Sequence, residues 1–101
     1  MHRIEWKQIA EDELNDIVDF IANESPTSAE HFAADLRTKV SKLVEHPELY
    51  RPGRKRGTRE MVVHPNYIVI YRIINKRAVV EILRVKHAAK KWPATGARAR
   101  D

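Results

Sequence analysis

The sequence predicts an α+β fold in which an antiparallel helical hairpin packs on one face of a mainly antiparallel sheet, in the order β-α-α-β-β-β. Two long β-branched runs, residues 67–74 and 78–85, follow a shorter run at residues 61–63. Three-residue polar breaks separate these runs, which is typical of tight hairpin connections. Upstream, two amphipathic segments offer apolar stripes that need a surface to cover. The sheet supplies that surface.

The chain begins with a short alternating segment, Arg3-Ile4-Glu5-Trp6, which predicts an edge strand. A helix follows over residues 9–23. Its apolar residues fall on one stripe, namely Ala10, Leu14, Ile17, Val18 and Ile21. Glu11, Asp12 and Glu13 lie in the first turn, where the helix dipole favours anions. We expect these three carboxylates to be solvated, because consecutive helical residues point in different directions and do not form a metal site.

The second helix is predicted to run from the Ser25-Pro26-Thr27 break to about Glu45. Ser25 is a candidate N-cap with Pro26 at the first helical position, and Thr27 with Glu30 is an alternative capping box. Because the break is short, the two helices should be antiparallel neighbours.

A strongly basic loop follows at residues 49–58, with the sequence LYRPGRKRGT. Proline and glycine mark it as a loop. Five cations occur in nine positions and would repel one another without a counter-charge, which favours a functional role over a mobile loop without a target. They are Arg51, Arg54, Lys55, Arg56 and Arg59.

Both faces of the strand at residues 67–74 are largely apolar. Tyr67, Val69, Tyr71 and Ile73 share one face, and the residues between them share the other. The helices can cover only one face, so the other is expected to receive a partner. Arg72 and Glu81 are expected to pair across the strands.

The predicted sheet ends in a basic segment, in which residues 87–92 form a short helical turn that Pro93 stops. Residues 94–101 read as a flexible tail. We therefore expect a single domain over residues 1–93.

Charge is distributed unevenly along the chain. The formal net charge is +5, but residues 1–48 carry −6 and residues 49–101 carry +11. This asymmetry predicts an acidic cover and a basic face for acidic or phosphate-rich partners. The absence of cysteine excludes disulfides and thiolate metal sites. No segment has the length and hydropathy of a membrane span or signal peptide, so a cytoplasmic protein is expected.

No cofactor is expected, because the nucleotide-binding, zinc and serine-nucleophile motifs are absent. The five dispersed histidines lack metal-ligand spacing, so no metal is expected either. Metal-free RNA cleavage is one available chemistry, and it needs a base, an acid and cations. Glu60 or His64 could be the base and His87 the acid, with Arg59 and Arg84 stabilising charge. Equally, His64 could simply shape the turn before Pro65.

The local sequence resembles the RelE/ParE superfamily of toxins from bacterial type II toxin–antitoxin modules. The similar segments are GTREMVV at residues 57–63, YIVIYR at residues 67–72 and VEILRVKHAA at residues 80–89. The resemblance covers nearly the whole chain. It implies a cognate antitoxin, acidic and folding on binding, in a hetero-oligomeric complex.

Two branches of this superfamily have different targets. The RelE-like branch cleaves mRNA in the ribosome, and the ParE-like branch poisons DNA gyrase without nuclease residues. RelE-type nucleases usually carry an arginine after the first tyrosine of Y-x-x-x-Y, where this chain has Ile68, and a tyrosine past the last strand, where it has Trp92. The resemblance therefore favours the ParE-like branch, a gyrase inhibitor rather than an enzyme.

A RelE-type endoribonuclease is the alternative, with Arg59, Glu60, His64, Arg84 and His87 as its candidate catalytic residues. A non-catalytic binding module or inactive toxin is the second alternative. The residues expected to bind the target or the antitoxin are basic or aromatic. They are Arg51, Arg54, Lys55, Arg56, Arg59, Arg84, Lys86, His87, Lys90, Lys91 and Trp92.

Overall fold

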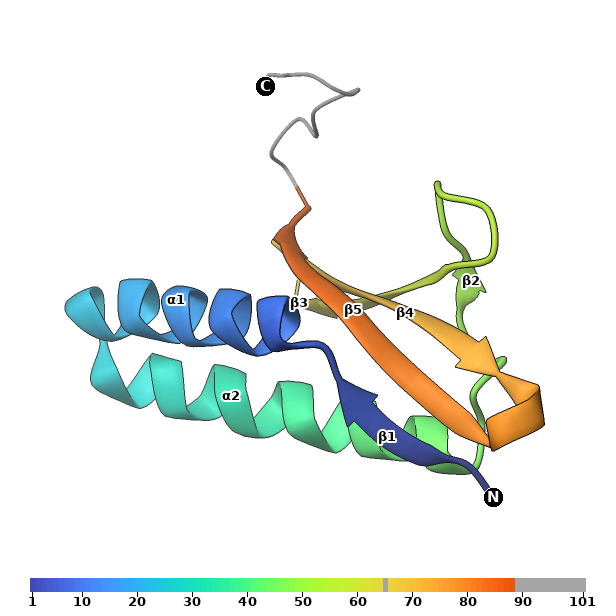
Figure 1. The fold of residues 1–101 in the computed structure, drawn as a ribbon. Helices are drawn as coiled ribbons and strands as arrows, with labels where there is room; N and C mark the ends of the chain where they lie inside the picture. The colour runs from blue at the N-terminus through green and yellow to red at the C-terminus, as the bar shows by residue number, and fades with distance from the viewer. Residues whose placement is uncertain (65, 89–101) are drawn as a thin grey trace.

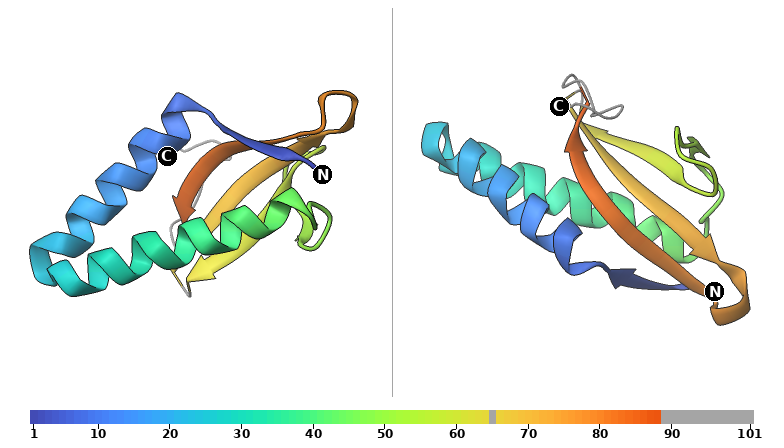
Figure 2. Two further views of the ribbon diagram at one scale, coloured as in Figure 1. Left: turned by 90° about the horizontal axis from the view of Figure 1, so that it is seen from below. Right: turned by 45° about the horizontal axis from the view of Figure 1, so that its top comes forward.

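Two helices cover one face of a five-stranded sheet, which confirms the predicted β-α-α-β-β-β arrangement (Figure 1). The structure is a computed structural model that describes residues 1–64 and 66–88. Its helical hairpin forms one layer, the twisted sheet forms the other, and the hairpin extends past the sheet on one side (Figure 2).

The hairpin consists of α1 (Gln8–Glu24) and α2 (Pro26–Ser41). Ser25 joins them and caps α2, because its Oγ accepts a hydrogen bond from the Ser28 N–H at 3.1 Å. This confirms the first of the two predicted caps, with Pro26 at the first helical position. A 3-10 turn at Lys42–Val44 continues α2, so the helical segment ends close to Glu45 as predicted.

The strand order is β1-β5-β4-β3-β2. The edge strand β1 (Arg3–Trp6) pairs in parallel with β5 (Val79–His87), and β4 (Tyr67–Ile74) lies between β5 and β3 (Arg59–His64) in antiparallel pairing. The second edge strand, β2 (Arg51–Pro52), lies in the basic loop and was not predicted.

A β-bulge in β5 decides which side chains face the helices. Ile70 pairs with Arg84 but the next residue, Tyr71, pairs with Ile82, so Leu83 is an extra residue on β5. Cross-strand partners share a face of the sheet. Because of the bulge, Arg84 lies on the face of the sheet opposite to Ile82. Lys86, two residues after Arg84, lies on the same face as Arg84.

The core lies between the helices and the Tyr71 face of the sheet. Leu36 and Leu43 from the helical side are fully buried against strand residues that include Met61 and Ile82. Tyr71 is also fully buried, and its hydroxyl donates a hydrogen bond to the Pro47 carbonyl at 2.7 Å. The apolar stripes of both helices thus cover the sheet face that the alternation predicts.

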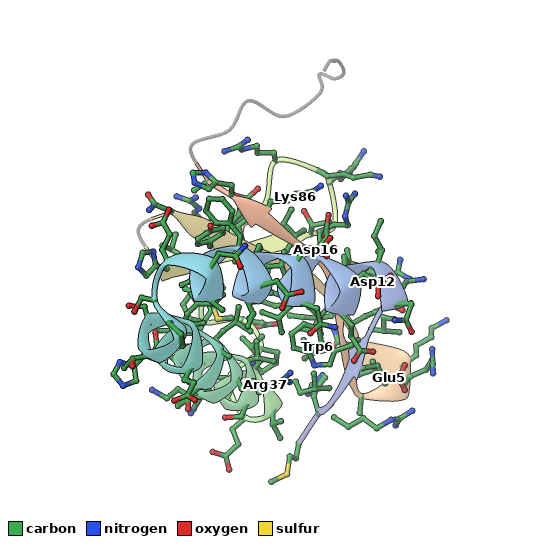
Figure 3. The ribbon with its side chains drawn as sticks, turned by 90° about the vertical axis from the view of Figure 1, so that its left-hand side faces the viewer. Glu5, Trp6, Asp12, Asp16, Arg37 and Lys86 are labelled. Carbon is green, nitrogen blue, oxygen red and sulfur yellow. The ribbon has the colours of Figure 1, made fainter. Side chains whose placement is uncertain are left out.

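At the N-terminal edge, Trp6 of β1 lies beside Arg37 of α2 (Figure 3), with the guanidinium carbon 6.0 Å from the ring centroid. The predicted pair Arg72 and Glu81 is confirmed, with 2.7 Å between Nε and Oε1. None of the helices in the described part of the chain is long and apolar enough to cross a membrane.

At the other end of β5 the structure differs from the predicted helical turn. His87 is the last residue of the strand, and the Ala88 N–H donates a hydrogen bond to the Asn66 carbonyl. Strand pairing with Tyr67 therefore extends to His87. The remainder of the predicted turn and the predicted tail lie outside the described residues.

Candidate functional site

A pocket of about 620 Å³ opens on the sheet face turned away from the helices, between the basic loop and β5. Its volume lies in the range typical of ligand sites. The apolar part of its lining comes from Ile9, Ile70 and Leu83. Cationic side chains surround this floor, namely Lys7, Arg54, Lys55, Arg84 and Lys86.

The β5 wall of the pocket is held by Glu13 of α1. Its carboxylate Oε2 lies 2.7 Å from Arg84 Nη2 and 2.8 Å from Lys86 Nζ, and Oε1 lies 3.1 Å from Arg84 Nε. Oε1 also accepts the Val85 N–H at 2.9 Å. Pairing with β1 reaches only Ile82, so this N–H lies beyond the strand pairing, and Glu13 satisfies it.

These contacts perturb the Glu13 carboxyl group. Burial acts to raise the pKa of Glu13, but hydrogen bonds from Arg84, Lys86 and the Val85 N–H outweigh it and hold that pKa below its usual value. Glu13 is therefore ionised in the folded protein and neutralises part of the charge of both cations. Lys86 lies above α1 in Figure 3, on the same side as Asp16.

The loop wall of the pocket is held by Glu60 of β3, which is only 4% exposed. Its carboxylate accepts a hydrogen bond from Arg51 Nη2 at 3.3 Å and from the Arg54 N–H at 3.0 Å. The Arg54 Nε also lies 3.9 Å from it. Glu60 thus supplies, within the chain, the counter-charge that the crowded cations of the basic loop require.

Arg59, the neighbour of Glu60, lies on the other face of β3. It pairs with Tyr71, whereas Glu60 pairs with Ile70. Its Nη1 donates hydrogen bonds to the carbonyl of Tyr50 at 2.7 Å and to that of Glu48 at 3.4 Å. Arg59 therefore ties the start of the basic loop to the sheet.

The two candidate histidines gather around Tyr67, at the opposite end of β3 from Arg59. The centroid of the Tyr67 ring lies 5.0 Å from that of His87 and 6.1 Å from that of His64. Phe32 of α2 completes this aromatic cluster, 5.1 Å from Tyr67. His64 Nδ1 accepts the Asn66 N–H at 3.3 Å, which fits a role in the turn.

Comparison with known proteins identifies the family. A family model described as "ParE toxin of type II toxin-antitoxin system, parDE" matches residues 4–92. The chain belongs to the ParE toxin family. It is accordingly the toxin of a type II toxin–antitoxin system.

Two named relatives of this toxin carry different labels. It is 40% identical to "Putative toxin Y4kP" of Sinorhizobium fredii, over 90% of this chain and 93% of the relative. It is 34% identical to "Toxin RelE2" of Caulobacter vibrioides, over 89% of this chain and 99% of the relative. The ParE family model and the relative named RelE2 together agree with the predicted RelE/ParE superfamily.

The fold of this toxin is also that of solved toxin structures. A chain of the chromosomal ParDE system from P. aeruginosa superposes with a TM-score of 0.72 at 23% identity, covering 86% of this chain and 96% of that one. A chain of the E. coli RelBE complex gives a TM-score of 0.64 at 16% identity, covering 89% and 100%.

The fold brings only some of the predicted site residues of this toxin together. Arg54, Lys55, Arg84 and Lys86 line the pocket together with Glu60. Arg51 contacts Glu60, and Arg56 lies exposed in the loop. Arg59, His64 and His87 are absent from the pocket lining. Three further predicted residues, Lys90, Lys91 and Trp92, lie outside the described part of the chain.

The main residue that sequence reasoning missed is Glu13. The expectation that all three first-turn carboxylates are solvated is wrong for Glu13, whose side chain is 18% exposed. A signal was available, because Glu13 follows Ala10 by three residues and precedes Ile17 by four, next to the buried stripe. Lys7 and Ile9 also line the pocket, but the sequence gives no such signal for them, since their position depends on how β1 pairs with β5.

Metal ligands were not expected, and residues 1–64 and 66–88 contain no group of three or more histidine or carboxylate side chains placed to hold an ion.

Proposed function

We propose that this toxin inhibits growth in the cytoplasm by poisoning DNA gyrase, and that a cognate antitoxin neutralises it in a hetero-oligomeric complex. Membership of the ParE family supports the gyrase branch. The residue at position 68 also supports the gyrase branch. RelE-type nucleases usually carry an arginine there, whereas this chain has Ile68, which is buried with 1% exposure.

The observation that carries this proposal is the separation of the candidate nuclease residues. Cleavage of RNA without metal needs a base, an acid and cations within reach of one phosphate. His64 and His87 lie around Tyr67, while Arg59 lies at the other end of β3 and is bonded to loop carbonyls. Glu60 already accepts hydrogen bonds from the basic loop. A non-catalytic toxin fits this arrangement best.

The test is purified gyrase with plasmid DNA, assayed for supercoiling and for trapped cleaved DNA. We expect the toxin to inhibit supercoiling and to accumulate cleaved plasmid. The His64→Gln/His87→Gln double variant should do the same, since neither histidine serves a chemical step. Supercoiling at the normal rate with no trapped cleaved DNA would contradict the gyrase proposal.

A ribosome-dependent endoribonuclease is the second candidate. One specific observation favours it, namely that Glu60 and Arg84 line the same cation-rich pocket. This candidate predicts mRNA cleavage on programmed ribosomes, and loss of cleavage in Arg84→Ala or His87→Ala. Intact mRNA after incubation with folded toxin would exclude it.

A further inference from the structure

We propose that the pocket between the basic loop and β5 is a docking site for an acidic segment that inserts one aliphatic side chain, and that Glu13 acts as an internal competitor that lowers its affinity. The proposal rests on the proposed neutralisation by an antitoxin, and it names the chemistry that this pocket recognises.

The charge around the pocket favours a ligand with a few carboxylates over a polyphosphate. Four of the five cations that line the pocket pair with three carboxylates of the chain. Lys7 pairs with Glu81 at 3.7 Å, and Arg54 pairs with Glu60. Arg84 and Lys86 both pair with Glu13. Arg72 shares Glu81 and Arg51 shares Glu60, so these carboxylates offset only part of the positive charge. Nucleic acid tracks in proteins instead present many cations to successive phosphates.

The floor of the pocket also favours a peptide. Ile9, Ile70 and Leu83 are aliphatic, and none of the described residues that line the pocket is an aromatic on which a base could stack. Ile9 is 48% exposed, so an inserted leucine or isoleucine would remove apolar surface from water on both partners. Carboxylates on either side of that side chain would then meet the surrounding cations.

Glu13 already binds the two cations of the β5 wall. Arg84 uses Nε and Nη2 for Glu13, and among the described residues its Nη1 makes no hydrogen bond. Its side chain is 38% exposed and that of Lys86 is 31% exposed, so both can reach a ligand. An incoming carboxylate would meet cations whose charge Glu13 has partly neutralised. Removing the Glu13 charge should therefore tighten binding.

The experiment measures fluorescence anisotropy of a labelled peptide of alternating glutamate and leucine added to the purified full chain. Two matched peptides replace every glutamate by glutamine or every leucine by serine, and an oligothymidylate is the nucleic acid probe. We expect the glutamate–leucine peptide to bind most tightly. Arg84→Ala and Ile9→Ser should each weaken it about tenfold, which is about 1.4 kcal/mol.

Glu13→Gln should tighten binding of the same peptide about threefold or more, corresponding to roughly 0.7 kcal/mol or more of relieved competition. Lys76→Ala is the control, because Lys76 lies in the 3-10 turn Asn75–Arg77, and Lys76 is not among the residues that line the pocket. Thermal melts establish that each variant is folded. Ile9 is half-exposed, so Ile9→Ser gives a readout that does not depend on core stability.

Equal binding of the three peptides, or weaker binding by Glu13→Gln, would overturn the proposal. Tighter binding of oligothymidylate that Arg84→Ala abolishes and Ile9→Ser leaves unchanged would assign the pocket to nucleic acid instead. The gyrase assay is independent of these outcomes. A chain that poisons gyrase but ignores the peptide would refute the pocket proposal alone, whereas a chain that binds the peptide and spares gyrase would refute the target alone.

Discussion

Glu13 of α1 and Arg84 of β5 form a two-point ion pair, with Oε2 2.7 Å from Nη2 and Oε1 3.1 Å from Nε. This pair joins the first turns of α1 to the free edge of β5, where Glu13 also accepts the Val85 N–H. It therefore acts on both the stability of the fold and the charge of the pocket.

The first prediction concerns Glu13 and pH. Glu13→Gln should lower the free energy of unfolding by about 1–3 kcal/mol at pH 7, because a half-buried charge pair is broken. The Glu13 pKa is lowered by folding from 4.5, so its contribution is complete above pH 4.5 and is lost as the pH falls through the folded-state value. Urea unfolding of both proteins at neutral and at acid pH measures the difference, which should shrink in acid.

Asp19→Asn is the matched control for this experiment, since Asp19 is an exposed carboxylate on the same helix. It should change the free energy of unfolding by less than about 0.5 kcal/mol. A constant difference between Glu13→Gln and the unmodified protein across the acid range would contradict the ion pair.

The second prediction concerns the anchor of the basic loop. Glu60→Leu should lower the free energy of unfolding by about 1–3 kcal/mol, because it leaves the Arg54 N–H without its acceptor and Arg51 without its counter-charge. It should also expose the loop to trypsin, which can cleave after Arg54, Lys55 and Arg56. Glu48→Gln, at an exposed position nearby, is the control. If the loop of Glu60→Leu resists trypsin as well as the control does, Glu60 does not anchor it.

The third prediction separates the two glycines of the loop. At Gly53 an added Cβ would collide with the Thr58 side chain and press on Glu60 Cγ, so Gly53→Ala should cost about 1–3 kcal/mol and loosen the loop. Gly57 has a φ of +82° with open space around it, so Gly57→Ala should cost about 1 kcal/mol through backbone strain alone. Trypsin sensitivity should rise more in Gly53→Ala. The reverse order would show that the loop is not packed as described.

The fourth prediction concerns Tyr71. Burial raises its pKa above 10.0, although the nearby Arg59 acts in the opposite direction. Because the folded state disfavours the phenolate, its contribution to stability is present below pH 10.0 and falls as the pH rises further. Ultraviolet titration should show a tyrosine ionisation step above pH 10.0 that Tyr71→Phe removes.

Tyr71→Phe should also cost about 1 kcal/mol at neutral pH, because the Pro47 carbonyl loses its donor. Tyr50→Phe is the control, and it should leave the late ionisation in place. A late step that persists in Tyr71→Phe would contradict the buried hydroxyl.

The elements of this fold could be predicted because each leaves a periodic signal in the sequence. The stripe from Ala10 to Ile21 and the run at Tyr67–Ile74 show their buried faces directly, and Ser25 before Pro26 shows a helix start. The two-residue strand β2 left no such signal, because its pairing with β3 depends on how the loop folds back on Glu60.

The candidate site was predictable only in part. The cations of the pocket could be predicted because basic residues are concentrated in the second half of the sequence. Their partners could not be predicted, because Glu13 and Arg84 are 71 residues apart in sequence and meet only through packing. The assumption that the basic loop lacks a counter-charge was also wrong. The pairing of β2 with β3 places Glu60 opposite Arg51, and the two side chains form an ion pair. The histidines looked equivalent to the arginines in sequence, yet strand register places them around Tyr67.

The bulge at Leu83 lets β5 carry one extra residue without exchanging the faces of its side chains. If β5 alternated regularly through Leu83, Arg84 and Lys86 would turn toward the helices and their charges would be forced into a hydrocarbon layer. The bulge absorbs Leu83 instead, so deleting Leu83 would leave both cations outside on a regular strand. Two toxins that differ by one residue at this point would therefore present the same surface, provided that the longer one forms the bulge. When relatives of this chain are aligned, a single gap at Leu83 marks the absence of the bulge, and substitutions on either side of it still compare position by position.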